Sequence, residues 1–229
     1  MKILKILTLI FLTTTFTYAQ VDCRPFLPNQ EGAKWELTNY NAKGKEQGKI
    51  VYEVAKKTVS GNDITFTIIH TTFDKKGDEI YTGSYDAKCI DGVFNLDMKS
   101  RMDSAAMKGF KDMEVRVDAS DFELPNLDAP AGTVLADGTL DVSMTSSALG
   151  FAMTVLIFDR KVEAAETIET PAGSFDCVVV SQKISTKMMI KVQAGSKEWY
   201  AENIGLVRTE SYNKKGKLMG YSEITKIII

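Results

Sequence analysis

The sequence predicts a mainly β protein with a single large, curved antiparallel sheet, half-barrel or clam-like in shape, and one short helix near the concave face. Polar and apolar residues alternate with a period of two along most of the chain, which is typical of strands with one buried face. Turn motifs suited to β-hairpins recur between these runs. About twelve strands result, and open twisted sheets of this size tend to curl or split.

The first half of the chain is predicted to be a meander of hairpins. The pentads Tyr40–Gly44, Phe73–Gly77 and Tyr212–Gly216 each place Asn or Asp in the second position and Gly in the fifth. Asn or Asp caps backbone amides in a type I turn, and Gly adopts the left-handed conformation that closes the hairpin. The lysines of these turns scatter along the sequence and alternate with acids, so we expect solvated turn residues. The strands expected in this half span residues 34–40, 49–59, 63–73, 79–89 and 93–99.

The middle of the chain interrupts the alternation. Residues 100–113 carry apolar side chains at Met102, Ala106, Phe110 and Met113. This spacing suits one face of a short helix. The helix is expected either to fill the concavity of the sheet or to gate it.

A proline-punctuated loop follows at Leu124–Gly132. Pro125 and Pro130 cannot donate to a central ladder, so the loop is expected to cross an edge or mouth of the sheet. It is either a lid or a plain connection.

Strands return after Thr139 and continue to the C-terminus, with a long ribbon from Thr170 to Ile229. Inside the ribbon, Trp199–Val207 reads as a hairpin with Gly205 in its turn. Trp199 is expected to face inward. The terminal strand, Ile224–Ile229, is expected either to pair inside the sheet or to form an exposed docking edge.

The N-terminus has the three parts of a secretory signal. Met1–Lys5 is basic, Ile6–Phe16 is apolar apart from threonines, and Ala19 supplies the small residue at the cleavage point. A membrane span needs about 20 apolar residues, so this shorter run is not expected to be a membrane anchor.

Residues 1–19 are therefore predicted to be a signal peptide and residues 20–229 a single β-rich domain. The mature protein is expected to be exported, periplasmic or extracellular, and without a transmembrane anchor. Gln20 stands where a lipoprotein signal has leucine, so lipidation of Cys23 is not expected.

The mature chain contains three cysteines, Cys23, Cys89 and Cys177. An oxidising compartment favours one disulfide and one remaining thiol. A bond between Cys23 and Cys89 is favoured because it would pin the N-terminal leader. Cys177 lies in an apolar run and is expected to be a buried small residue.

Three segments together resemble a known family: Glu31–Glu36, Thr170–Cys177 and Trp199–Val207. They resemble the TapB-like family of uncharacterised exported envelope proteins of Gram-negative bacteria. The resemblance covers nearly all of the mature chain, but its motifs are turns and strand ends. It implies export and a curved antiparallel sheet, and it implies no catalytic residues.

The residues give little support to catalysis. His70 is the single histidine, no Gly-x-Ser-x-Gly elbow is present, and neither Cys89 nor Cys177 has an activating pattern around it. Metal and nucleotide motifs are missing, so no catalytic residue, metal site or cofactor is predicted. The formal net charge of −2 gives no reason to expect a nucleic-acid partner.

The favoured hypothesis is a non-catalytic binding protein whose concave face holds an apolar or amphipathic molecule. Its predicted ligand-binding residues are Phe66, Met144, Phe151, Met153 and Trp199. The alternative is a module with a closed core that contacts another envelope protein. An enzyme is the third hypothesis and the least favoured.

Overall fold

The computed structural model describes residues 24–101, 114–145 and 150–228. Fourteen strands and one short 3-10 helix, η1, account for most of these residues. The elements are β1 (Lys34–Asn41), β2 (Glu46–Ser60), β3 (Asp63–Asp74), β4 (Glu79–Ile90), β5 (Val93–Asp97), η1 (Met98–Arg101), β6 (Glu114–Ala119), β7 (Asp121–Glu123), β8 (Gly138–Thr145), β9 (Gly150–Val162), β10 (Glu166–Thr170), β11 (Gly173–Lys187), β12 (Lys191–Ala201), β13 (Gly205–Tyr212) and β14 (Leu218–Ile228).

The strands form one antiparallel sheet in the order β6-β8-β9-β11-β12-β13-β14-β1-β2-β3-β4-β5-β7, and β10 pairs only with β11. The two ends of this order, β6 and β7, are separated in sequence by Ser120 alone. β6 pairs with β8, and β7 pairs with β5. The chain therefore joins the two edges of the sheet covalently, and the sheet is nearly closed on itself.

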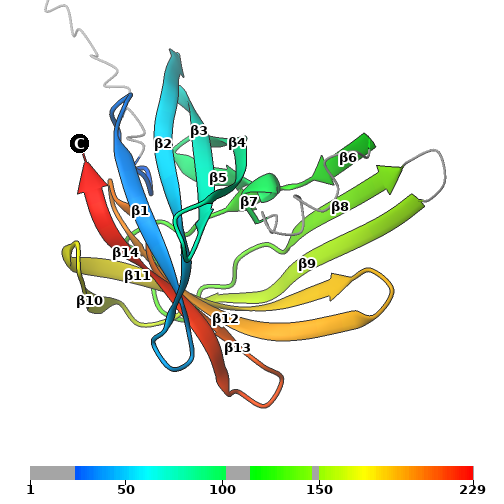
Figure 1. The fold of residues 1–229 in the computed structure, drawn as a ribbon. Helices are drawn as coiled ribbons and strands as arrows, with labels where there is room; N and C mark the ends of the chain where they lie inside the picture. Colours follow the sequence, from blue (N-terminus) through cyan, green and yellow to red (C-terminus); the bar gives the residue numbers. More distant parts are fainter. Residues whose placement is uncertain (1–23, 102–113, 146–149, 229) are drawn as a thin grey trace, which may run out of the picture.

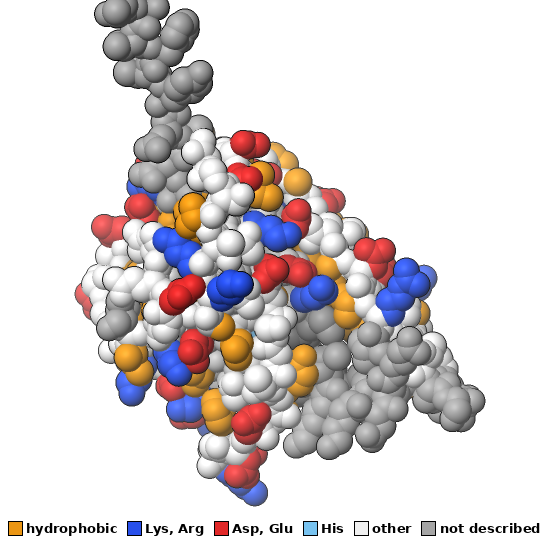
Figure 2. Space-filling model, turned by 90° about the horizontal axis from the view of Figure 1, so that it is seen from above, with side chains coloured by type: hydrophobic (Ala, Val, Ile, Leu, Met, Phe, Trp, Pro, Cys, Tyr) orange, Lys and Arg blue, Asp and Glu red, His pale blue; other side chains and the backbone are white. Residues whose placement is uncertain are grey.

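Figure 1 shows the sheet as two splayed halves: β1 to β5 rise on one side, and β8, β9, β12 and β13 extend on the other. Apolar side chains from both halves meet between them, among them the fully buried Phe66, Ile68, Leu140 and Val142. Seen from above, acidic, basic and apolar side chains are mixed over the surface (Figure 2). The predicted fold class, a mainly β protein with one large curved antiparallel sheet, is confirmed.

The predicted hairpin turns form for the expected reason. Asn41, Asp74 and Asn213 each accept two backbone N–H groups from the residues that follow them. The glycine three residues later has a φ of 74° to 88° in all three turns, a region that other residues rarely adopt. Local chemistry therefore fixes these tips without help from the core.

The predicted helix over residues 100–113 falls largely outside the described residues. Of the predicted range only Ser100 and Arg101 are described, and they end the 3-10 helix η1 (Met98–Arg101). The meander before it follows the predicted strands closely, since β1 to β5 begin and end within a few residues of the expected limits.

The C-terminal strand is internal to the sheet. β14 pairs with β13 on one side and with β1 on the other, and Ile224 is fully buried. Of the two alternatives for this strand, internal pairing is confirmed and the exposed edge is wrong for residues 218–228.

Candidate functional site

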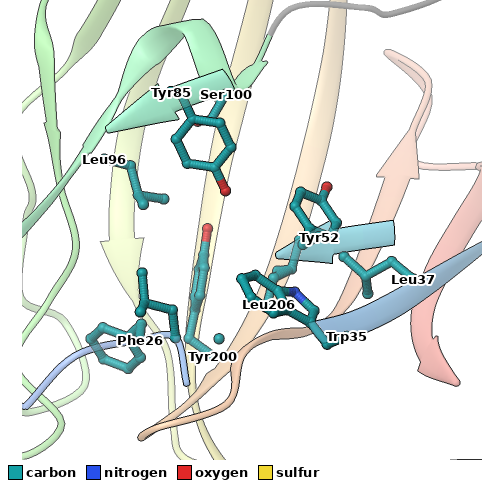
Figure 3. A pocket seen from close by; sticks show the side chains of 11 residues that line it. Phe26, Trp35, Leu37, Tyr52, Tyr85, Leu96, Ser100, Tyr200 and Leu206 are labelled. Carbon is teal, nitrogen blue, oxygen red and sulfur yellow. The ribbon is translucent and has the colours of Figure 1, made fainter. Parts of the chain in front are cut away.

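An aromatic-lined cavity of about 70 Å³ lies on the inner face of the sheet. Figure 3 shows it lined by side chains from the N-terminal segment and from strands on both halves. Its walls are Phe26, Leu27, Trp35, Leu37, Tyr52, Tyr85, Leu96, Ser100, Tyr200, Gly205 and Leu206.

One wall is a stacked aromatic pair. Trp35 of β1 lies opposite Tyr52 of β2 in the ladder, so both side chains point to the same face of the sheet. Their ring centroids are 5.1 Å apart and their planes differ by 9°. The facing wall is made by Tyr200 of β12, whose ring meets that of Phe26 edge-on at 5.7 Å.

Polar groups enter the cavity at one side. In Figure 3 the hydroxyl groups of Tyr85 and Tyr200 point toward each other across the space. Tyr200 also donates to the carboxylate of Glu198, which is itself buried. The hydroxyl of Ser100 is buried and has no hydrogen-bond partner among the described residues. An apolar cleft with a few convergent polar groups is the usual form of a small-molecule site.

His70 lies beside this cavity and not at the rim of the sheet. Its ring is 5.8 to 6.3 Å from those of Tyr52, Tyr81 and Tyr85, and its burial lowers the pKa of the imidazole. Within the described part of the chain, its Nδ1 has no hydrogen-bond partner. A catalytic triad needs a carboxylate at that position, so the described residues form no triad on His70.

The five residues predicted to bind ligand lie around the core. Phe66, Met144 and Trp199 are buried, and Phe151 and Met153 are half-buried against the same core. None of the five is among the residues that line the inner cavity. Their role in binding stays a prediction.

Trp199 was expected to face inward, but its neighbour Tyr200 lines the cavity instead. The two are successive residues of β12 and point to opposite faces of the strand. Tyr200 lines the cavity, while Trp199 donates its indole N–H to Glu166 of β10 at 2.9 Å. The alternation shows that only one of them can face inward. It does not show which, because β10 covers the outer face and buries Trp199 as fully as the core buries Tyr200.

The carboxylate of Glu166 is expected to make a pH-dependent contribution to the free energy of unfolding. Hydrogen bonds from Lys197 and then from Trp199 lower its pKa below the ordinary 4.5. A depressed folded-state pKa stabilises the protein above the unfolded pKa, and this stabilisation is lost as the pH falls through the folded value. Because the side chain is 40% exposed, the effect is expected to be at most about 1 kcal/mol.

Glu166→Gln should therefore lower the free energy of unfolding at neutral pH by up to about 1 kcal/mol and flatten its dependence on pH below about 4.5, where the two proteins converge in stability. Urea unfolding at a series of pH values measures this. Glu163→Gln is the matched control, and an equal change in both variants would contradict the assignment to Glu166.

Residues 30–224 match the model of the DUF3108-like family. The chain belongs to this family. A comparison with curated proteins found no match. A protein of Bacteroides fragilis that is classed as exported and has a YmcC-like fold is 28% identical, with a TM-score of 0.79. A protein of Parabacteroides distasonis that is classed as a lipoprotein is 26% identical, with a TM-score of 0.80. Each match covers 90% of this chain and all of the other.

The sequence predicts relatives that are uncharacterised exported proteins, and these two relatives are of that kind. The comparisons support the DUF3108-like family and the YmcC-like fold, whereas membership of the TapB-like family stays a prediction. No helix among residues 24–101, 114–145 and 150–228 is long and apolar enough to cross a membrane. These same residues contain no cluster of three or more His, Cys, Asp or Glu side chains able to hold a metal ion.

In this DUF3108-like chain the side chain of Arg24 holds the N-terminal segment beside the cavity. Arg24 donates to both carboxylate oxygens of Glu202, at 3.1 and 2.9 Å, and to Asp128 at 2.8 Å. The hydrogen bond from Arg24 lowers the pKa of Glu202. The Asn203 amide donates to the Pro25 carbonyl. The turn of the Trp199–Val207 segment thus holds Phe26 in the cavity wall.

The proline loop contacts the same arginine, because Asp128 accepts a hydrogen bond from Arg24. Two open surface grooves of about 450 and 540 Å³ meet at Arg24 and Asp128. Cys177 lines the larger groove, and burial raises the pKa of its thiol to about 12. A thiol that remains protonated at neutral pH is a poor nucleophile.

The cysteines divide into one bonded and one free residue in the described part of the chain. Cys89 is disulfide-bonded, and Cys177 is a free, buried thiol, as expected. Cys23 lies outside the described residues, so the Cys23–Cys89 pairing stays a prediction.

Proposed function

We propose that this protein is a non-catalytic, exported binding protein that holds an apolar or amphipathic molecule on its inner face. The observation that carries the proposal is the stacked Trp35–Tyr52 wall facing the hydroxyl groups of Tyr85 and Tyr200. Aromatic faces supply contact area for a ring or acyl chain, and hydroxyl groups fix the orientation of a polar end.

The volume of the cavity limits what can enter it. Sites for drug-sized ligands usually measure about 300–1,000 Å³, and this cavity measures about 70 Å³. It therefore accepts one small ring, or the end of a chain whose remainder lies outside. Of the residues predicted from the sequence, Phe66, Met144, Phe151 and Met153 stay in the proposal as the surrounding apolar core, while Trp199 lies on the opposite face beside Glu166.

Export is part of the proposal. The N-terminal signal pattern, with cleavage expected after Ala19, and the two relatives classed as exported protein and lipoprotein support it. The mature protein would then meet apolar molecules in the periplasm or outside the cell.

The two tryptophans of the chain provide a direct test. Trp199→Phe leaves Trp35 in the cavity wall as the sole tryptophan, and Trp35→Phe leaves only Trp199 on the opposite face. Titration with 4-nitrophenol, a quenching ring with a hydroxyl group, is expected to quench Trp35 emission saturably. Trp199 emission should show only linear collisional quenching.

Tyr200→Phe removes one cavity hydroxyl and keeps the ring. It is expected to weaken 4-nitrophenol binding by roughly five- to tenfold, the equivalent of one hydrogen bond. Linear quenching of Trp35 in the Trp199→Phe protein, together with no uptake of palmitate in native mass spectrometry, would overturn the proposal.

The small volume of the cavity also favours a second candidate, a closed-core module that contacts another envelope protein. Under that hypothesis neither probe binds. A cavity-filling substitution such as Leu96→Phe would then leave contact with the protein partner unchanged. In a binding protein the same substitution would abolish the saturable quenching of Trp35 by 4-nitrophenol.

A further inference from the structure

The tip of the β11–β12 hairpin is unlike the other hairpin tips. Met188, Met189 and Ile190 form it, and their exposed fractions are 40%, 86% and 75%. Val192, one residue into β12, is also exposed. Single exposed apolar side chains are ordinary, but a contiguous run at a protruding tip marks an interaction site.

Lysines flank this apolar tip on both strands and on the next hairpin. Lys187 and Lys191 pair with each other at the base of the tip. Gly195 pairs with Tyr212, which places the β13–β14 turn at the same end of the sheet. Figure 1 shows the two hairpins as neighbouring loops, orange and red, on the lower right of the molecule.

The register brings two further lysine-rich turns to the same rim. Asn41 pairs with Gly220, and Gly48 pairs with Asp74, so the β1–β2 and β3–β4 turns follow the β13–β14 turn around the sheet. The exposed lysines of these four tips are Lys43, Lys45, Lys75, Lys76, Lys187, Lys191, Lys214, Lys215 and Lys217. Within the described part of the chain, none of them is in an ion pair.

A groove of about 460 Å³ lies between the β11–β12 and β13–β14 hairpins. Phe158, Ala194 and Tyr212 give it apolar walls, and Lys183 and Lys214 lie at its margin. The apolar tip, the lysines and this groove therefore lie next to one another along the same rim. The groove has room for an apolar chain.

We propose that this rim docks the protein on an anionic lipid bilayer. The Met188–Ile190 tip enters the interface between headgroups and acyl chains, and the lysines lie at the level of the phosphates. An apolar tip surrounded by cations suits a surface that is anionic outside and apolar beneath. A protein partner would need a complementary concave acidic site, whereas a bilayer supplies both features at once.

Sedimentation with large unilamellar vesicles tests the proposal on the whole mature protein. Binding is expected to vesicles of phosphatidylcholine mixed with phosphatidylglycerol, and to be weak with phosphatidylcholine alone. Added salt should weaken binding, because screening reduces the attraction of exposed charges. Equal binding to both vesicles, or binding to neither, would overturn the proposal.

Two double variants separate the contributions. Lys187→Gln with Lys191→Gln is expected to weaken binding by about fivefold for each charge removed. Met189→Ser with Ile190→Ser should weaken binding at least about tenfold, since both side chains leave the interface. Neither pair is buried, so thermal unfolding should not change.

The matched control lies at the opposite end of the sheet. Val59→Ser with Lys56→Gln removes an exposed apolar residue and an exposed lysine from β2 near the β2–β3 tip, and should leave vesicle binding unchanged. Equal loss in the control would overturn the assignment to this rim. Analytical ultracentrifugation without vesicles tests whether the tip instead binds a second copy of the chain. If Met189→Ser with Ile190→Ser converts a dimer to a monomer, the tip is a dimer contact and the proposal fails.

Discussion

Replacing Arg160 with leucine is expected to lower the free energy of unfolding by about 3–5 kcal/mol. Arg160 is 1% exposed, the largest fully buried side chain of the described protein. Its guanidinium donates to the carbonyls of Ala136 and Glu123, each at 2.6 Å. It also lies over the ring of Phe122, 3.6 Å from the centroid.

These contacts hold the two edges of the sheet together. Arg160 belongs to β9, near one end of the strand order, while Phe122 and Glu123 belong to β7 at the other end. A bulge at Asp159, whose φ is 51°, shifts the register so that Arg160 lies beside Gln182. Leucine would fill part of the space but would leave the part-buried carbonyls of Ala136 and Glu123 without their charged donor.

Urea denaturation measures the effect. Arg160→Lys is expected to fall between wild type and Arg160→Leu, because an ammonium cannot reach both carbonyls with the fork geometry of a guanidinium. Lys183→Met, which breaks an exposed ion pair with Asp159, should change the free energy of unfolding by less than about 1 kcal/mol. A loss in Arg160→Leu no larger than in this control would contradict the role given to Arg160.

The second large effect is expected at Gly205. Its φ is +106°, and a Cβ atom there would lie 2.9 Å from the carbonyl oxygen of Phe26. Gly205→Ala therefore combines an unfavourable backbone conformation with a contact against backbone that cannot move aside. The free energy of unfolding should fall by about 2–3 kcal/mol.

The same substitution should loosen the N-terminal segment. Displacement of Phe26 breaks the hydrogen bond from Asn203 to Pro25, so the Asn203 amide is expected to exchange faster with deuterium than in wild type. Gly61→Ala is the control, since Gly61 also has a positive φ of +63° but nothing within 4 Å of its Cβ position. If both variants lose equal stability, the contact with Phe26 contributes nothing.

Sequence patterns predict the local structure of this protein well. The turns at Asn41, Asp74 and Asn213 depend on side chains that bind their own backbone and on glycines three residues later. The strand limits follow from those turns and from the alternation between them. Interactions of this kind span only a few residues, so neighbouring residues contain all the information required.

The candidate site could be predicted only in outline. A concave apolar face was expected, yet the cavity is lined by Trp35, Tyr52, Tyr85 and Tyr200 and not by the five residues selected from the sequence. Alternation predicts that residues share a face, but it does not predict which face becomes the inside. That depends on how the sheet curls and on what covers its outer side.

The sequence by itself determined the hairpins, their turns, the antiparallel curved sheet and the signs of export. Only the tertiary structure decided that Tyr200 faces the cavity, that Arg160 joins the two edges of the sheet, and that lysines from four separate turns share one rim. The physical reason is the range of the interactions. Turns and strands are stabilised by neighbours in sequence, whereas inner face, closure and surface charge depend on the register between strands distant along the chain.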